Sequence, residues 1–208
     1  MRVGFKSMLL AGALAFMAAC SDGTNPNDGG PRPADSLTIL TLAQGHPPLA
    51  AQSVTFWARY DQDTEGRIDF QTSPTETEEY LKFKVPQHSL MRFPDGTAFA
   101  TGDSVLITIT VINADSLYFD FQPHGLKFSR GKPAELTLEY NHAGSTIEGD
   151  FNDDDQVDAQ DALIEIQLKV WVQETPGGLF APLTGILEVE FDEVQAEISG
   201  FSRFALAY

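Results

Sequence analysis

A run of acidic residues in the C-terminal third of this 208-residue chain has the spacing of a metal site. Residues 148–161 read EGDFNDDDQVDAQD and contain seven carboxylates and no Lys or Arg. A hard cation such as Ca²⁺ binds about six to eight oxygens, which a tight loop supplies from alternate residues. The spacing matches positions 1, 3, 5, 7, 9 and 12 of a twelve-residue calcium loop and predicts bound Ca²⁺. The six predicted ligand residues are Asp150, Asn152, Asp154, Gln156, Asp158 and Asp161.

The other positions of this loop are compatible with the same prediction. The seventh position contributes a backbone carbonyl, so Gln156 is acceptable there, and Val157 supplies the usual apolar eighth residue. The sixth position is usually Gly because the turn needs a positive φ, and Asp155 tolerates that conformation better than most residues. We expect weak binding, with a dissociation constant on the order of 10⁻⁴–10⁻³ M. The alternative is a solvated acidic turn without an ion.

Residues 149–163 resemble the calcium loop of dockerin modules, which have Asp at the last ligand position, as Asp161 would be here. The resemblance implies calcium binding. A dockerin has two such loops, each followed by a helix, whereas this chain has one. Apolar and polar residues alternate over 164–172, which is a strand pattern. We therefore expect the loop to connect strands of a sheet, and we do not expect docking to a cohesin.

The chain shows no recognisable catalytic motif. Its four His residues are scattered beside turn residues, and it has neither an HExxH motif nor a glycine-rich phosphate loop. Residues 200–204 begin like a nucleophile elbow but lack its final Gly. We therefore predict that the protein is not an enzyme. A hydrolase that uses two of the many carboxylates remains the least favoured alternative.

Two Trp residues are candidates for an exposed aromatic contact. Trp57 and Trp171 lie on expected strands. Each is out of step with the apolar alternation of its strand, so it would face away from the regular apolar side. An exposed Trp on a sheet can stack on a sugar ring or anchor a protein partner. Trp171 follows the dockerin-like loop, so it is the possible ligand contact if the protein is a glycan-binding module. A strand that is buried on both faces explains either Trp equally well.

The N-terminus has the layout of a secretory signal. Arg2 and Lys6 precede an apolar run over 8–17, which is too short to span a bilayer. Met17, the last residue of this run, is followed by Ala18, Ala19 and Cys20. Residues 1–20 therefore resemble a bacterial lipoprotein signal peptide. The resemblance implies that Cys20 is acylated and attaches the protein to a membrane. A plain secretory signal with an incidental Cys is the alternative.

Charge and composition restrict the partners and the compartment. The formal net charge is −17, and removal of the signal leaves 11 basic and 30 acidic residues, or −19. Such a chain would be repelled by nucleic acid. Residues 21–36 are rich in Gly, Pro, Asn and Asp and predict a flexible tether. We expect an outer-membrane lipid-anchored protein of the bacterial cell envelope, either periplasmic or surface-exposed.

The rest of the chain has the period-two alternation of short β-strands separated by turn residues. We predict an all-β fold over residues 37–208, an antiparallel β-sandwich with an inserted EF-hand-like calcium loop at 148–161. No stretch shows an amphipathic helix of ordinary length. The expected strands are 37–43, 53–60, 66–71, 79–85, 105–112, 117–122, 136–140, 163–173, 187–192, 194–199 and 202–207.

Three segments resemble the β-sandwich domain shared by zonula occludens proteins, netrin receptors and ankyrins. Residues 81–90 (LKFKVPQHSL) resemble its strand-Pro-Leu entry, and residues 121–129 (FQPHGLKFS) are similar to its aromatic-x-Pro-x-Gly-Leu-x-Phe stretch. Residues 200–206 (GFSRFAL) resemble its closing strand. The resemblance spans roughly 79–208. It implies a contact module without catalytic residues.

The sequence thus predicts a lipid-anchored, exported β-sandwich with a structural calcium site that acts as an interaction or envelope module. Its expected partners are a membrane, through Cys20, and an unidentified protein or glycan. The alternative is a glycan-binding surface module of a polysaccharide-handling system.

Overall fold

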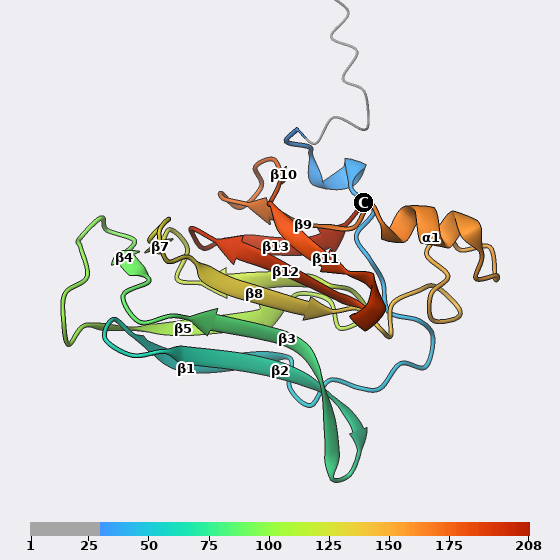
Figure 1. Ribbon diagram of the computed structural model, residues 1–208, viewed down its shortest axis with the longest axis horizontal. Coiled ribbons are helices and arrows are strands. Elements are labelled where there is room, and N and C mark those ends of the chain that lie inside the picture. Colours follow the sequence, from blue (N-terminus) through green and yellow to red (C-terminus); the bar gives the residue numbers. More distant parts are fainter. Residues whose placement is uncertain (1–29) are drawn as a thin grey trace, which may run out of the picture.

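The computed structural model describes residues 30–208 as two antiparallel β-sheets packed face to face (Figure 1). The six-stranded sheet has the order β1 (Ser53–Arg59), β5 (Ser104–Val111), β6 (Tyr118–Gln122), β13 (Arg203–Ala207), β9 (Lys169–Gln173) and β10 (Ala181–Pro182). The five-stranded sheet has the order β11 (Gly185–Glu188), β12 (Glu193–Ile198), β8 (Ala134–Glu139), β3 (Glu76–Val85) and β2 (Thr64–Ser73). The predicted all-β architecture is confirmed. The predicted signal and Cys20 lie outside the described residues.

Shorter elements complete the described part of the chain. Strands β4 (Leu90–Arg92) and β7 (Lys127–Phe128) form a two-stranded sheet at one end of the sandwich. The helical segments are η1 (Ala34–Ser36), α1 (Ala159–Glu165) and η2 (Val189–Phe191). Between residues 30 and 208, no helix combines the length and apolar character needed to cross a bilayer.

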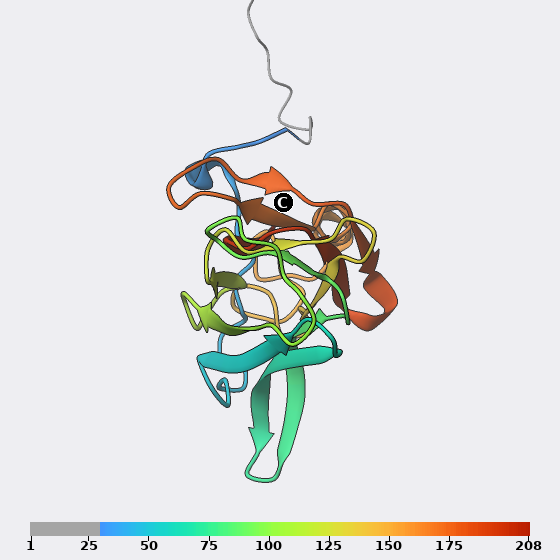
Figure 2. The ribbon, with the colours of Figure 1, turned by 90° about the vertical axis from the view of Figure 1, so that its left-hand side faces the viewer.

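Alternation along most of the longer strands produces the core between the sheets. In β12, Val194, Ala196 and Ile198 are buried while the residues between them are exposed or half-buried. Two apolar faces of this kind bury each other, which removes hydrocarbon from water and drives sandwich formation. Figure 2 shows the β2–β3 hairpin projecting from one side of the sandwich, with its turn well away from this core.

An aromatic cluster at the centre of the core joins three distant parts of the sequence. Phe83 of β3, Phe121 of β6, Phe128 of β7 and Phe201, which precedes β13, are all buried. Their contacting rings have centroids 5.0 to 6.0 Å apart, mostly edge to face. Each such pair contributes about 0.5–1.5 kcal/mol beyond the burial of its area. The aromatic residues of the three family-like segments therefore meet in one cluster.

The N-terminal part of the described chain packs on the six-stranded sheet. The backbones of Arg32 and Phe180 exchange two hydrogen bonds of 2.7 Å, and the Arg32 guanidinium lies 5.3 Å from the centroid of the Trp171 ring. Leu37 packs into the same small apolar cluster. The folded body therefore begins before residue 37, inside the predicted tether. Residues 37–43 form only isolated bridges, so the strand predicted there is wrong.

The strand predicted over 163–173 begins later than expected. Residues 159–165 form helix α1, and β9 starts only at Lys169. Asp158 caps the helix, since its side chain accepts a hydrogen bond from the Gln160 backbone N–H at 2.6 Å. The Asp161 side chain accepts one from the Asp158 backbone N–H at 2.8 Å, which completes a capping box. The acidic loop is therefore followed by a helix.

Candidate functional site

The acidic segment 148–161 connects β8 to β9 and lies beside the C-terminal residue Tyr208 (Figure 1). The Tyr208 hydroxyl donates a 2.8 Å hydrogen bond to the Phe151 carbonyl. The backbone of Gly144 pairs with that of Glu148 just before the acidic run. These contacts attach the start of the loop to the sandwich and so fix where the six predicted ligand residues lie.

Asp150 is the buried centre of the loop. Its side chain is fully buried and accepts hydrogen bonds from the backbone N–H groups of Asp153 at 2.9 Å and Asp155 at 3.0 Å. The Asp154 backbone N–H donates a third at 3.2 Å and the Ser145 hydroxyl a fourth at 2.7 Å. The hydrogen bond from Ser145, followed by those from the backbone, keeps the pKa of Asp150 below its usual value. Asp150 is therefore a buried anion.

Asp161 closes the loop from its other end. This side chain is almost fully buried, and its Oδ1 accepts hydrogen bonds from the backbone N–H groups of Phe151 at 2.8 Å and Asn152 at 3.3 Å. Its Oδ2 accepts the bond from Asp158 that belongs to the helix cap. One carboxylate therefore links the first residues of the loop to the start of α1.

The other four predicted ligand residues are more accessible. Asn152 is half-buried, whereas Asp154, Gln156 and Asp158 are exposed. Asn152 and Asp154 each accept a hydrogen bond from the backbone N–H two residues further on, at 3.1 and 3.0 Å. The oxygens of this loop are thus directed at its own backbone. Within residues 30–208, no three His, Cys, Asp or Glu side chains converge as a group that could hold a metal ion.

The backbone at the sixth loop position has the conformation that the sequence predicted. Asp155 has a φ of +62°, in the left-handed region that Gly usually occupies. The Thr146 hydroxyl donates a 2.5 Å hydrogen bond to the Asp155 carboxylate and so supports this unusual residue. Asp153 has a similar φ of +63°. The chain therefore adopts a tight turn at this position without Gly.

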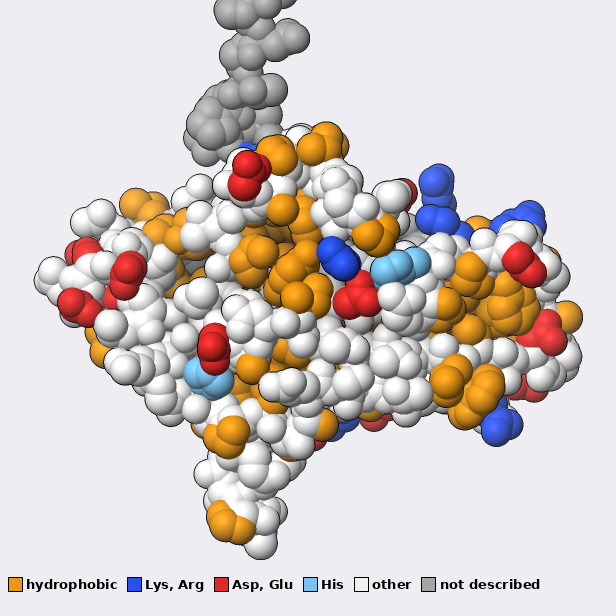
Figure 3. All heavy atoms as spheres, turned by 180° about the vertical axis from the view of Figure 1, so that it is seen from behind, with side chains coloured by type: hydrophobic (Ala, Val, Ile, Leu, Met, Phe, Trp, Pro, Cys, Tyr) orange, Lys and Arg blue, Asp and Glu red, His pale blue; other side chains and the backbone are white. Residues whose placement is uncertain are grey.

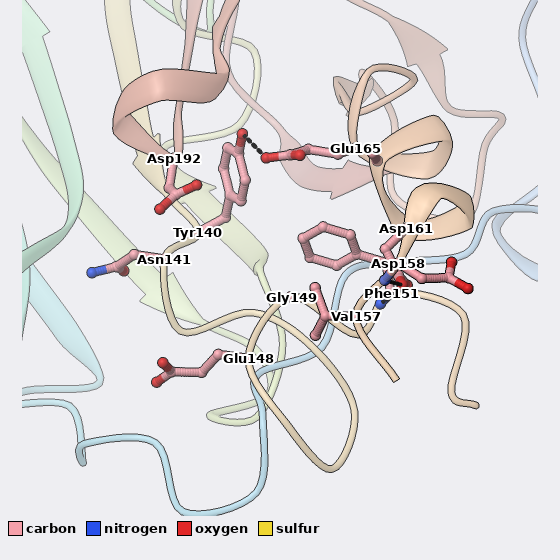
Figure 4. A pocket seen from close by; sticks show the side chains of 11 residues that line it. Tyr140, Asn141, Glu148, Gly149, Phe151, Val157, Asp158, Asp161, Glu165 and Asp192 are labelled. Carbon is pink, nitrogen blue, oxygen red and sulfur yellow. Dashed lines mark hydrogen bonds between the residues drawn. The ribbon is translucent and has the colours of Figure 1, made fainter. Parts of the chain in front are cut away.

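A cavity of about 310 Å³ lies between the loop, α1 and the end of β8, which sequence reasoning missed. Figure 4 shows the Tyr140 and Phe151 rings inside it, with Glu165 on one side and Asp192 on the other. The Tyr140 hydroxyl donates a 3.0 Å hydrogen bond to Glu165. No local pattern signals this cavity, because only the fold brings together separate parts of the connection 140–165 and Asp192.

The predicted ligand contact at Trp171 is wrong. Trp171 is only 3% exposed, and its indole N–H donates a 3.1 Å hydrogen bond to the Ala207 carbonyl. Residues 30–39 cover the outer side of β9, so both faces of this strand are buried. Trp57 is instead 58% exposed on β1, directly opposite Leu106 of β5, which is also exposed. Figure 3 shows apolar patches on the rear face of the molecule, interrupted by acidic side chains.

Two of the scattered histidines lie in charged networks. His124 and Arg203 both contact Asp120 Oδ1, at 2.9 and 3.2 Å. His142 contacts Glu148 at 2.6 Å and Glu78 at 3.3 Å. These partners are distant in sequence or separated by a turn, so the spacing of the histidines did not indicate them.

Searches among protein families, curated proteins and solved structures found no match to this chain. The resemblances to dockerins, lipoprotein signals and the zonula occludens-type sandwich therefore remain predictions from the residues themselves.

Proposed function

We propose that the protein is a lipid-anchored β-sandwich of the bacterial cell envelope, with a structural Ca²⁺ site in the loop 150–161 and a non-catalytic role in contacts with a partner. The observation that carries the calcium site is the buried, anionic Asp150 inside a segment of seven carboxylates that contains no basic residue. Charges gathered in this way repel one another unless solvent screens them or a cation binds.

The loop has the parts that Ca²⁺ would need. Asp161 Oδ2 accepts one hydrogen bond and keeps a lone pair for a metal bond, whereas each Asp150 oxygen already accepts two, so Ca²⁺ would have to displace one of these donors. Asp150 and Asp161 would bind the ion from the buried side, and Asp154 and Asp158 from the exposed side, with Asn152 and the Gln156 carbonyl completing the set. The positive φ at Asp155 and the helix that follows the loop favour this reading over a plain acidic turn.

Thermal melting of the mature chain, from residue 21, across a calcium titration tests the site, with magnesium as control. At tenfold above the dissociation constant, we expect about 1.4 kcal/mol of added stability. Asp154→Ala should abolish this increment, because it removes the ligand oxygen that Asn would keep. The matched control Asp153→Asn removes the neighbouring exposed charge, at a position that supplies no ligand, and should keep it. A flat titration, or an equal calcium response in both variants, would refute the site.

The remaining parts of the proposal rest on the sequence. Attachment through Cys20 follows from the lipoprotein-like signal, and metabolic labelling with a fatty acid tests it, since Cys20→Ser should remove the label. The role in contacts follows from the family-like segments, whose aromatic residues form the core cluster and leave no catalytic set to carry over.

A glycan-binding role is the second candidate, and one observation favours it. Trp57 presents more than half of its surface to solvent beside exposed Leu106, and the next pair on the same face, Thr55 and Thr108, offers hydroxyl groups. A sugar ring stacks on Trp through its apolar face while its hydroxyls bind polar neighbours. A glycan array read with wild type and Trp57→Ala decides this, because a specific hit must disappear in the variant.

A further inference from the structure

The cavity between α1 and η2 combines aromatic walls with carboxylates that have few partners. Tyr140 and Phe151 meet edge to face, with ring centroids 6.4 Å apart. Glu165 receives one side-chain hydrogen bond, from Tyr140. The half-buried carboxylate of Asp192 makes no hydrogen bond or ion pair with any described residue, and burial raises its pKa. A carboxylate withdrawn from water without a partner is costly, and a cation would offset that cost.

The charge around the cavity is almost entirely negative. Between Lys132 and Arg203 the chain contains sixteen Asp and Glu residues and a single basic residue, Lys169. Five of the residues that line the cavity are acidic and none is basic; the acidic ones are Glu148, Asp158, Asp161, Glu165 and Asp192. This concentration of charge attracts a cationic partner and repels an anionic one.

Exposed apolar side chains lie on the elements that border the cavity. Val157 lines it and is 59% exposed, and Phe191, next to Asp192, is 67% exposed. Leu163 on α1 and Ile166 directly after it are also exposed and adjoin the lining residues Ala162 and Glu165. Apolar groups beside an acidic hollow fit a partner that carries both basic and apolar side chains.

We propose that this cavity receives a Lys or Arg side chain from a basic, amphipathic peptide segment of a partner protein. The cation pairs with the carboxylates of Glu165 and Asp192 beside the half-buried Phe151 ring, while apolar residues of the segment cover Phe191 and the exposed side of α1. The volume is near the lower end of the range for small ligand sites, which suits one long side chain. Aromatic rings and carboxylates together are the usual surroundings of a bound ammonium or guanidinium group.

This inference deepens the proposed contact role and is separable from calcium. Glu165 and Asp192 lie outside the loop 150–161, whereas Asp158 and Asp161 belong to both the loop and the cavity wall. Bound Ca²⁺ would lower the negative charge of one wall and leave the other unchanged. We therefore expect the segment to bind in the presence of calcium and somewhat more tightly in its absence.

The test is fluorescence anisotropy with short labelled peptides that contain Arg and Leu. The two residue types are spaced either as on one face of a strand or as on one face of a helix. Matched peptides have Glu for Arg or Ser for Leu. Wild type should bind at least one Arg–Leu peptide and neither kind of control peptide. The double variant Glu165→Gln, Asp192→Asn should weaken that binding at least about tenfold, because interactions with charged partners are lost. Phe191→Ser should weaken it by a smaller factor.

The control variant removes the same charge elsewhere. Glu76→Gln, Glu174→Gln neutralises two exposed carboxylates that do not line the cavity, and it should change affinity less than about twofold, as a screened distant charge does. Circular dichroism must show that both double variants are folded. Equal affinity of the two double variants, or failure of wild type to bind any Arg–Leu peptide, overturns the inference. Binding of free arginine as tight as that of the peptides also overturns it, since no peptide segment is then recognised.

The calcium titration separates the two proposals. If calcium does not change the melting temperature but the cavity variants still bind the peptide more weakly than their control, the calcium site is refuted and the inference stands. If Asp154→Ala removes the calcium response but the cavity variants bind like their control, the inference fails and the calcium site stands.

Discussion

Glu139 of β8 lies directly opposite Glu193 of β12, so two carboxylates face each other across neighbouring strands on the outer side of the five-stranded sheet. Burial, and then the charges of Glu79, Glu193 and Glu78, raise the pKa of Glu139 from 4.5 to about 7. Like charges placed opposite each other destabilise a sheet. The folded protein therefore retains a proton on Glu139 that the unfolded chain releases at lower pH.

Stability should fall as the pH rises through about 7 because of this group. A carboxyl whose pKa is raised on folding stabilises the protein fully below its unfolded pKa of 4.5, and this contribution is lost above its folded pKa. Glu139→Gln removes the charge and keeps the shape. We expect the variant to gain about 1–2 kcal/mol over wild type at pH 8, after discounting for solvent screening at a partly exposed site. Urea melts between pH 5 and pH 8 measure this difference.

Glu135→Gln is the matched control for this prediction. Glu135 points outward from the same strand but pairs with Lys84 at 3.5 Å, so its neutralisation should give no gain at pH 8. An unchanged gap between wild type and Glu139→Gln across this pH range would contradict the raised pKa.

Most strands could be predicted from the sequence because their burial follows local alternation. Residues 117–121 and 194–198 alternate in sequence, and in the structure their odd and even positions respectively are buried. The left-handed turn at Asp155 was also predictable, since the spacing places this residue at the loop position that needs a positive φ, whereas the spacing did not indicate the burial of Asp150. The strand alternation and the turn at Asp155 both depend on residues that are near neighbours in the sequence.

The errors arose where packing of a distant segment, or a local helix cap, overrides the alternation along the chain. Trp171 lies on the outer side of its strand, and only the packing of residues 30–39 buries it. Alternation over 164–172 indicated one long strand, yet the cap at Asp158 starts a helix, and Ile166 is 62% exposed. The cavity beside Tyr140 needs four separate segments, so no pattern along the chain reveals it.

The helix cap at Asp158 makes a second prediction. Asp158→Ala removes the acceptor for the Gln160 N–H and should lower the free energy of unfolding by about 0.5–2 kcal/mol, measured in EDTA so that any calcium effect is absent. Asp158→Ser keeps a capping oxygen and should restore most of the loss. If Ser is as damaging as Ala, the cap does not stabilise α1.

The aromatic cluster should dominate stability. Phe201 is buried and contacts Phe83, Phe121 and Phe128, so Phe201→Ala should cost about 3–5 kcal/mol. The control Phe191→Ala truncates a Phe that is 67% exposed and should change stability by less than about 0.5 kcal/mol. Chemical denaturation measures both, and similar losses would mean that the cluster is not the centre of the core.

A side chain from the other sheet should prevent any residue larger than Gly from fitting at position 66 of β2. A Cβ at this position would collide with the ring of Phe56, a half-buried residue of β1 that packs against the core. Because the clash is with a well-packed ring, Gly66→Ala should cost about 1–3 kcal/mol. Gly131→Ala is the control, since its nearest neighbour would be the Ser129 hydroxyl at 3.9 Å, and it should be nearly neutral.

Phe56→Leu provides the decisive partner in a double-mutant cycle. The smaller Leu side chain leaves room for the methyl group that Gly66→Ala adds. In the Phe56→Leu protein, the loss of unfolding free energy caused by Gly66→Ala should therefore be smaller by about 0.5 kcal/mol or more. Strictly additive costs would show that contact between β1 and β2 does not require Gly at this position.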